Sequence, residues 1–282
     1  MIGAAYAQLS AVSYGVSDFV GGVAARRVAA LRVMLVSYPV AAVMLGLLAV
    51  HAGGPIHPGA ILWGSLYGIS QAIGVWWFYA AMSSGPISVV SPLAAVLNAA
   101  VPIAVGVAIG ERPGETASVG VVLAMIAVFL VGRESPDDED VRTHRFTRRV
   151  AWLTVGAGVA FGLDFVLLHQ APVECRLWPL FFARASATVL VFAVAAATGN
   201  FQMPTKTPLR LALTAALLDT FANIAMLMAL HAWLLSLASM LISLYPAATV
   251  VLAMVVLRER VTRWQGLGMV LAMVAVAMIT AA

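Results

Sequence analysis

Charged residues are scarce in this 282-residue chain. They make up 10% of it, whereas hydrophobic residues make up 62%, and the mean hydropathy is +0.99. A soluble domain is about half apolar and about a quarter charged. This chain has too little polar surface to cover a water-soluble fold, so lipid is the expected solvent. We therefore predict an all-α polytopic membrane protein.

Other absences exclude several kinds of chemistry. Cys175 is the single cysteine, which excludes an internal disulfide and a cysteine metal site. Lys206 is the only lysine, and no Gly-x-x-x-x-Gly-Lys-Ser/Thr loop exists, so the chain is no ATPase of the P-loop kind. It also lacks His-Glu-x-x-His, Gly-x-Ser-x-Gly and any acidic cluster outside residues 133–149. We expect no enzyme, no metal and no other cofactor.

Ten apolar blocks stand between the breakers of the sequence. A bilayer core of about 30 Å takes roughly 20 helical residues per crossing, and the blocks approach that length. The first block is too long, and lacks the basic start, for a cleaved signal, so it is predicted to be the first span. The predicted spans are 3–24, 31–50, 60–82, 86–109, 116–132, 150–170, 177–198, 209–230, 234–257 and 264–281.

A sequence echo divides the chain into two halves. Glu111-Arg112 recurs as Glu259-Arg260, and the stretch 120–128 recurs in part as 268–276, always 148 residues apart. Residues 1–132 and 150–282 are thus predicted repeats, joined by a charged linker at 133–149. Each repeat holds five spans, and five is odd, so the second enters the membrane from the opposite side. The expected fold has ten transmembrane helices as two inverted five-helix repeats, with the binding site between them.

Positive charge is distributed unevenly between the two ends of the predicted bundle. The end with both termini holds three basic residues (Arg112, Arg176 and Arg184). The other end holds thirteen: Arg26, Arg27, Arg32, Arg133, Arg142, Arg145, Arg148, Arg149, Lys206, Arg210, Arg258, Arg260 and Arg263. The positive-inside rule places the richer end in the cytoplasm and both termini outside. Because these residues lie at helix ends, anionic lipid headgroups rather than nucleic acid are the expected partners, despite a pI near 9.6.

Several motifs resemble those of one transporter family. They are Tyr14-Gly15-Val16-Ser17-Asp18-Phe19-Val20-Gly21-Gly22, 85–93 running to Gly110-Glu111-Arg112-Pro113, 161–166, 177–180, 217–223, and Ser243-Leu244-Tyr245-Pro246-Ala247 running to Glu259-Arg260. The chain resembles EamA-type members of the drug/metabolite transporter superfamily over nearly its whole length. The resemblance implies a central cavity in a prokaryotic-type inner membrane and movement of small metabolites or toxic compounds, mostly outward. The chain departs from the pattern at 231–233, and the family is usually drawn with its termini in the cytoplasm.

Three carboxylates, Asp18, Asp164 and Asp219, lie inside predicted spans. A charge at mid-bilayer costs at least about 2.5–3.5 kcal/mol, and protonating an Asp at pH 7 costs about 4 kcal/mol. Because the costs are similar, such a residue suits proton coupling. Asp18 and Asp164 occupy equivalent Asp-Phe-Val frames and are expected on opposed sides of one cavity. The alternative is a fixed bond, with one of them capping a helix or paired with Arg184.

Further polar residues complete the candidate pathway. Gln71 is the repeat mate of Asp219, and Asn223 follows Asp219 by one helical turn, on the same face. Both face the cavity or, equally, form interhelical hydrogen bonds. The stripe Ser88, Ser91, Ala95 and Asn98 matches Ser236, Ser239, Ser243 and Pro246, a pattern typical of close helix packing. Within the motifs, Tyr14, Asn98 and Tyr245 are candidate substrate contacts.

Three functions remain on this sequence. The first is a secondary active exporter of a small molecule, working by alternating access and coupled to protons or to substrate exchange. The second is a passive facilitator, and the third a flippase for lipids or lipid-linked compounds. If the three acids are ionised, the cavity is negative and favours cationic or zwitterionic substrates. Pairs of small residues such as Gly64/Gly68 pack helices within one protomer or between two, which leaves a homodimer open.

Overall fold

The computed structural model describes residues 2–108, 115–131, 146–232, 242, 245–259, 261 and 263–280, which form helices and short connections without any strand. The first half holds α1 (Ile2–Ala25), α2 (Ala30–Ala52), α3 (Pro58–Ser84), α4 (Ile87–Ala108) and α5 (Glu115–Val131). The second holds α6 (Arg148–His169), the 3-10 turn η1 (Val173–Cys175), α7 (Trp178–Ala197), α8 (Lys206–Ala232), α10 (Tyr245–Val256) and α11 (Arg263–Thr280).

The helices follow the predicted spans to within a few residues. The tight connection expected between the third and fourth spans is Gly85-Pro86, where the Gly85 N–H closes α3 by donating to the Ala81 carbonyl at 2.8 Å. The expected turn near 230–234 and the first half of the span 234–257 fall largely outside the described residues. The count of ten spans therefore stays a prediction.

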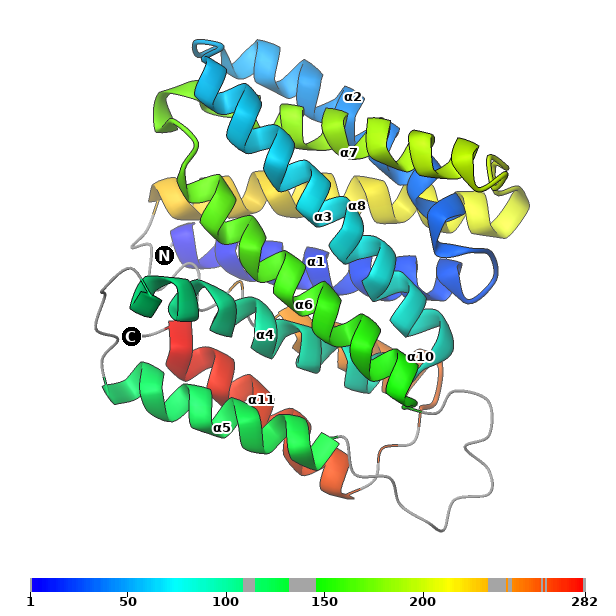
Figure 1. Ribbon diagram of the computed structural model, residues 1–282, viewed down its shortest axis with the longest axis vertical. Coiled ribbons are helices and arrows are strands. Elements are labelled where there is room, and N and C mark those ends of the chain that lie inside the picture. Colours follow the sequence, from blue (N-terminus) through cyan, green and yellow to red (C-terminus); the bar gives the residue numbers. More distant parts are fainter. Residues whose placement is uncertain are drawn as a thin grey trace.

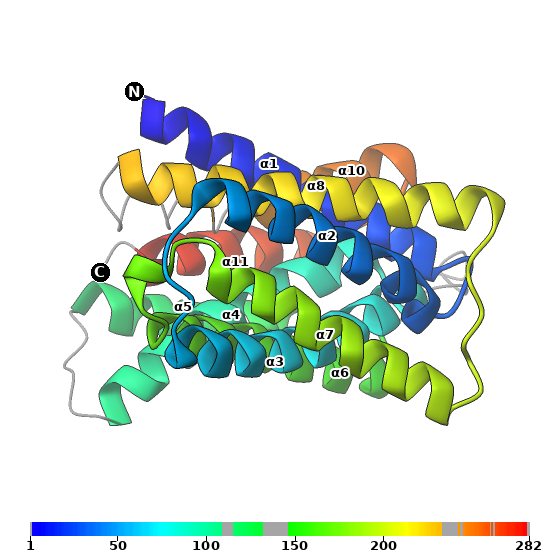
Figure 2. The same ribbon diagram turned by 90° about the horizontal axis from the view of Figure 1, so that it is seen from above.

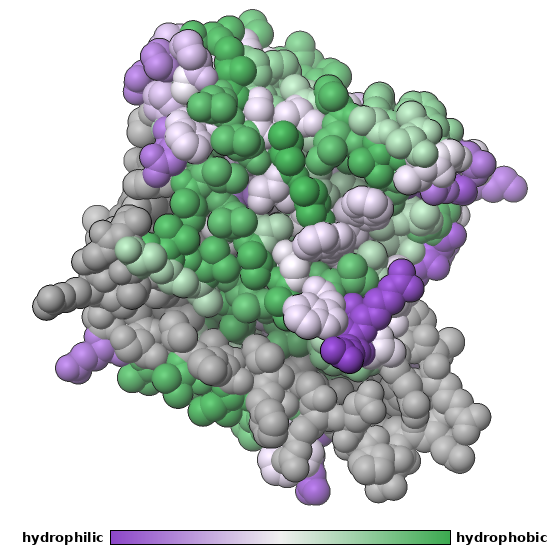
Figure 3. Space-filling model, in the orientation of Figure 1, coloured by the Kyte–Doolittle hydropathy of each residue, from purple (hydrophilic) through white to green (hydrophobic). Residues whose placement is uncertain are grey.

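The described helices expose apolar side chains on their outer faces. Four of them, α2, α6, α7 and α8, are long and apolar enough to cross a membrane, by length and composition. Val50 and Val255 are each 70% exposed, whereas Ser17 and Arg184 are buried. Figure 3 shows apolar residues over the middle of one face and most hydrophilic residues at its edges. Polar groups inside and apolar groups outside are what a lipid solvent requires.

Figure 2 shows two layers of helices, each drawn from both halves of the chain. One layer contains α1, α2, α8 and α10, and the other contains α3, α4, α6 and α7. The pairing α1 with α8 in the first layer has its counterpart, α6 with α3, in the second, and α4 packs on α6 as α10 packs on α1. Both termini lie at one end of the bundle, and α6 runs opposite to α1 (Figure 1). The two halves are thus arranged as inverted repeats.

Glycines allow close contacts between helices of the same layer. A Cβ on Gly68 in α3 would collide with the Ala183 carbonyl of α7, and one on Gly158 in α6 would lie 2.8 Å from the Ala94 carbonyl of α4. Serine hydroxyls form hydrogen bonds between closely packed helices as well. The hydroxyl of Ser17 in α1 donates to the Ala215 carbonyl of α8 at 2.9 Å. Such close backbone approach is how helices associate in lipid.

Candidate functional site

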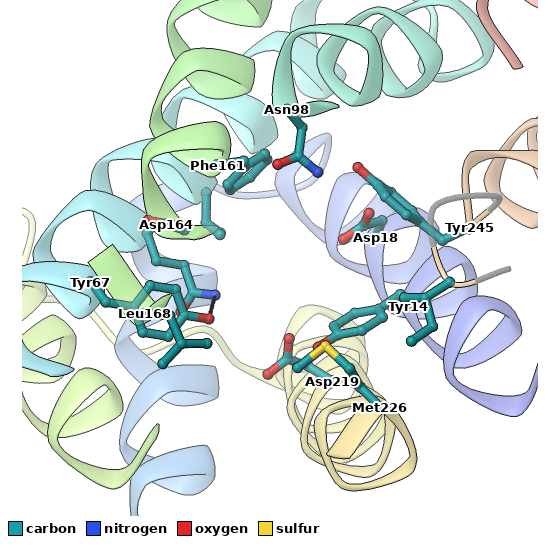
Figure 4. Close-up of a pocket in the computed structure, with 13 residues that line it drawn as sticks. Tyr14, Asp18, Tyr67, Asn98, Phe161, Asp164, Leu168, Asp219, Met226 and Tyr245 are labelled. Atoms are coloured by element: carbon teal, nitrogen blue, oxygen red, sulfur yellow. Dashed lines mark hydrogen bonds between the residues drawn. The ribbon is translucent and has the colours of Figure 1, made fainter. Parts of the chain in front are cut away.

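A cavity lies between the two layers, near the middle of the bundle. It encloses about 850 Å³ of space, its opening included. Three helices of each half line it: α1, α3 and α4, and α6, α8 and α10. The lining residues are Tyr14, Asp18, Tyr67, Gln71, Val75, Asn98, Phe161, Asp164, Leu168, Asp219, Met226, Ile242 and Tyr245 (Figure 4).

Most of the residues singled out in the sequence meet at this cavity. Its lining includes all three predicted carboxylates and, with them, Tyr14, Gln71, Asn98 and Tyr245. Arg184 stands behind the wall and lines a smaller adjoining pocket. Asn223 is buried and does not line the cavity. Its amide donates at 2.8 Å to the backbone carbonyl of Asp219, within α8 and not between helices, so this bond is neither of the two roles expected for Asn223.

Arg184 holds Asp219 in a fixed polar network. The Nη2 of Arg184 lies 2.6 Å from the Oδ2 of Asp219, with side-chain exposures of 6% and 28%. The Nη1 donates to the Oε1 of Gln71, whose Nε2 donates at 2.9 Å to the hydroxyl of Tyr67. The guanidinium also lies 5.4 Å from the ring centroid of Tyr38. These contacts neutralise the charge of Asp219 and link α2, α3, α7 and α8.

Asp18 and Asp164 form no ion pair with the described residues, although Ser70 lies within hydrogen-bonding reach of Asp164. Asp18 forms no hydrogen bond or ion pair within the described part of the chain, and it faces the cavity. Asp164 is only 7% exposed, and its Oδ1 is buried without a hydrogen-bond partner there. Figure 4 shows the two on opposite sides of the cavity, on α1 and α6, which are equivalent helices of the two repeats. The fixed pairing with Arg184 that the sequence left open thus falls to Asp219.

Aromatic and sulfur-containing side chains complete the wall. The rings of Tyr14 and Tyr245 meet edge to face, with centroids 6.4 Å apart. The Tyr14 hydroxyl lies 3.9 Å from the Met226 sulfur. Phe161 and Met226 were not predicted as lining residues, because they are ordinary residues of apolar helices. Helical spacing offered a signal, since Phe161 precedes Asp164 by one turn and Met226 follows Asp219 by two.

The cavity extends toward the end of the bundle that holds both termini. Leu168 is the next-to-last residue of α6, Met226 lies in the last quarter of α8, and both helices end at that side. Ile242, just before α10, also lies there. The described lining residues therefore run from the middle of the bundle toward this end, and the smaller pocket adjoins the cavity at Asp18, Val75 and Asp219.

A cluster of hydrogen bonds, here called the clasp, joins four chain segments at the opposite end. Arg26 pairs with Glu259 at 2.7 Å and donates to the carbonyls of Met82 and Gly85 at 3.1 and 3.0 Å. Glu259 also accepts from the backbone N–H groups that begin α4, at 3.2 and 3.0 Å. A carboxylate at a helix N-terminus is stabilised by the helix dipole. The clasp ties α1, the α3–α4 turn, α4 and the end of α10 together.

The repeat echo in the sequence marks Glu259 but not its partners. Its counterpart Glu111 lies outside the described residues. Among the residues that the structure describes, no group of three His, Cys, Asp or Glu side chains is placed to hold a metal ion.

Comparison with known proteins identifies the family. Twelve solved chains match the structure; one, described only as "Crystal structure of protein", has a TM-score of 0.59 over 96% of each chain at 10% identity, which shows a shared fold. No curated protein matches the sequence. The model of the EamA-like transporter family matches twice, over residues 1–133 and 148–281. With nearly the whole chain covered by two copies of this transporter domain, the chain is an integral membrane protein that belongs to the EamA-like transporter family.

Proposed function

We propose that this protein is a secondary active transporter that exports a small molecule across the cell membrane. Substrate binds in the central cavity, and the two layers rock against each other to expose it to alternate sides. The main observation behind the proposal is that two carboxylates, Asp18 and Asp164, line a cavity between the repeats and form no ion pair with the described residues. No fixed positive charge neutralises them, so protons or a substrate must do so.

The two ends of the bundle support alternating access. In the present arrangement the cavity extends toward the end with the termini, while the clasp of Arg26 and Glu259 holds the other end together. Breaking the clasp while closing the first end would turn the cavity to the other side. Protonation of Asp18 and Asp164, or exchange of one substrate for another, is the event proposed to bias the two arrangements.

The carboxylates give a direct test of coupling. Purified protein is placed in vesicles that contain a pH-sensitive dye, and a panel of small metabolites and toxic compounds is added under an imposed proton gradient. The wild type is expected to accumulate at least one compound against its gradient, with proton movement. The double variant Asp18→Asn/Asp164→Asn should lose accumulation and proton movement. Glu174→Gln, which removes an exposed acid outside the cavity, is the matched control.

The outcomes separate the candidate functions. A variant that equilibrates the compound without accumulating it shows that the fold conducts substrate and that the carboxylates couple it. A double variant that accumulates as well as the wild type would overturn the coupling role. A wild type that only equilibrates every compound it moves would identify a facilitator and overturn active transport.

A further inference from the structure

We propose that the cavity selects organic cations, whose ammonium group is bound by the carboxylates that line the cavity, Asp18 and Asp164, and whose apolar body lies against the aromatic wall. This proposal rests on the proposed function, because it assigns the substrate class of the same site. It commits to cations over zwitterions, anions and neutral molecules.

The charges that line the cavity are the first reason to expect a cation. Of the three lining carboxylates, Asp219 is neutralised by Arg184 at 2.6 Å, whereas Asp18 and Asp164 have no ionic partner in the described residues. An uncompensated charge buried in a low-dielectric site is costly, and a bound cation offsets that cost. An anionic ligand would add a third unpaired negative charge to the same space.

The unpaired hydrogen-bond acceptors of the cavity wall further restrict the kind of ligand that fits. The Oδ1 of Asp164 and the Oδ1 of Asn98 are both buried acceptors without a donor among the described residues. An unpaired buried acceptor costs about 1–3 kcal/mol. An ammonium group has donors and no acceptor, so it matches a wall of this kind. Quaternary ammonium ions offer charge alone, which makes protonated amines the better fit.

The position of Arg184 argues against zwitterions. A ligand carboxylate would need a cationic partner, and Arg184 is the one basic side chain facing this site in the described residues. Its guanidinium is already held by Asp219 and Gln71 and lies over the ring of Tyr38. Releasing it for a ligand would leave Asp219 unpaired, so a carboxylate on the ligand gains little.

The rest of the wall suits an aromatic or aliphatic body. Tyr14 and Tyr245 present an edge-to-face pair at 6.4 Å, and Phe161 lies near Asp164 (Figure 4). Faces of aromatic rings attract cations by about 0.5–2 kcal/mol. The expected ligand is therefore an amphipathic amine.

A series of ligands that share one phenyl body tests the assignment. Phenethylamine is the cation, L-phenylalanine the zwitterion, 3-phenylpropionate the anion and 2-phenylethanol the neutral member. Dissociation constants are measured by calorimetry on the purified full chain in detergent at neutral pH. Phenethylamine is expected to bind at least about tenfold more tightly than each of the others, a difference of about 1.4 kcal/mol.

Variants show whether the two carboxylates cause the preference. Asp18→Asn/Asp164→Asn should bind phenethylamine and 2-phenylethanol about equally, whereas the control Glu174→Gln should keep the preference for the amine. Binding of 2-phenylethanol by the Asn variant distinguishes lost charge from lost folding. The proposal is overturned if L-phenylalanine or 3-phenylpropionate binds as tightly as the amine, if the Asn variant keeps the full preference, or if the amine does not bind at millimolar concentration.

Failure of this assignment and failure of the transport proposal give different results. Coupled vesicle transport together with preferred binding of the anion or the zwitterion would overturn the cation assignment alone. Selective amine binding that depends on Asp18 and Asp164, without movement of any amine into vesicles, would overturn transport and leave the cation site standing.

Discussion

At the scale of single residues, the three aspartates that line the cavity differ in whether they form an ion pair. Asp219 is paired with Arg184, whereas Asp18 and Asp164 face the cavity without a partner. The sequence predicted an interior position for all three, because a charge in a membrane span needs one. It offered Asp18 or Asp164 as the partner of Arg184 and missed Asp219, since that choice depends on how α7 and α8 lie side by side in space.

Removing Arg184 is expected to destabilise the protein through Asp219. In Arg184→Gln the carboxylate keeps its charge in a partly buried site, and a loss of about 1–3 kcal/mol in the free energy of unfolding is expected, less than for a fully buried pair because the cavity hydrates Asp219. Chemical unfolding in mixed micelles measures it. In a double-mutant cycle with Asp219→Asn, the second change should recover part of the loss.

One outcome of the same double-mutant cycle would contradict this prediction. If Arg184→Gln and Asp219→Asn add independently, the two side chains do not act as a pair. Asp18→Asn is the control, because Asp18 has no ionic partner to lose; its unfolding free energy should stay level or rise.

At the scale of helices, the predicted and observed helix positions agree, because local sequence determines where a helix begins and ends. Apolar runs ended by Gly, Pro and Arg located the helices to within a few residues, and the odd number of spans per repeat predicted inversion. Which helices touch was not predictable, because the pairing of α1 with α8 joins residues some 200 apart, as in the bond from Ser10 to the Ala222 carbonyl. For the same reason, the clasp partner of Glu259 could not be found from the repeat echo.

The clasp is expected to keep one end of the bundle closed. Charge-assisted hydrogen bonds stabilise by about 1.5–3 kcal/mol, so Glu259→Gln should raise the opening of that end about tenfold or more. A cysteine at Ser37, a buried position in the smaller pocket, reports it by its rate of thiol labelling in a Cys175→Ser background. The expected result is a faster rate in the Glu259→Gln protein.

Arg27 supplies the matched control for the clasp. It is the exposed neighbour of Arg26, and its side chain forms no hydrogen bond or ion pair with the described residues. Arg27→Gln removes the same charge as Arg26→Gln, yet only Arg26→Gln should speed labelling. Equal rates in the two variants would show that general charge, and not the clasp, governs closure.

At the scale of the whole molecule, orientation decides which compartment the cavity faces. Thirteen of the sixteen basic residues were assigned to the end opposite the termini, and moving so many across the membrane is unfavourable. The structure describes some of them there, including the clasp residue Arg26 and its neighbour Arg27. We expect both termini, and the cavity in its present arrangement, to face the outside of the cell.

Single cysteines at the two ends test this orientation in intact cells. In a Cys175→Ser background, Ile56→Cys marks the end with the termini and Thr198→Cys marks the other, both at exposed positions. A membrane-impermeant maleimide should label Ile56→Cys in intact cells and Thr198→Cys only after lysis. The reverse pattern would place the termini in the cytoplasm, as in the usual arrangement of the family. The cavity would then face the cytoplasm in this structure, and the clasp would seal the outer end, so that this arrangement would be the loading state of an exporter.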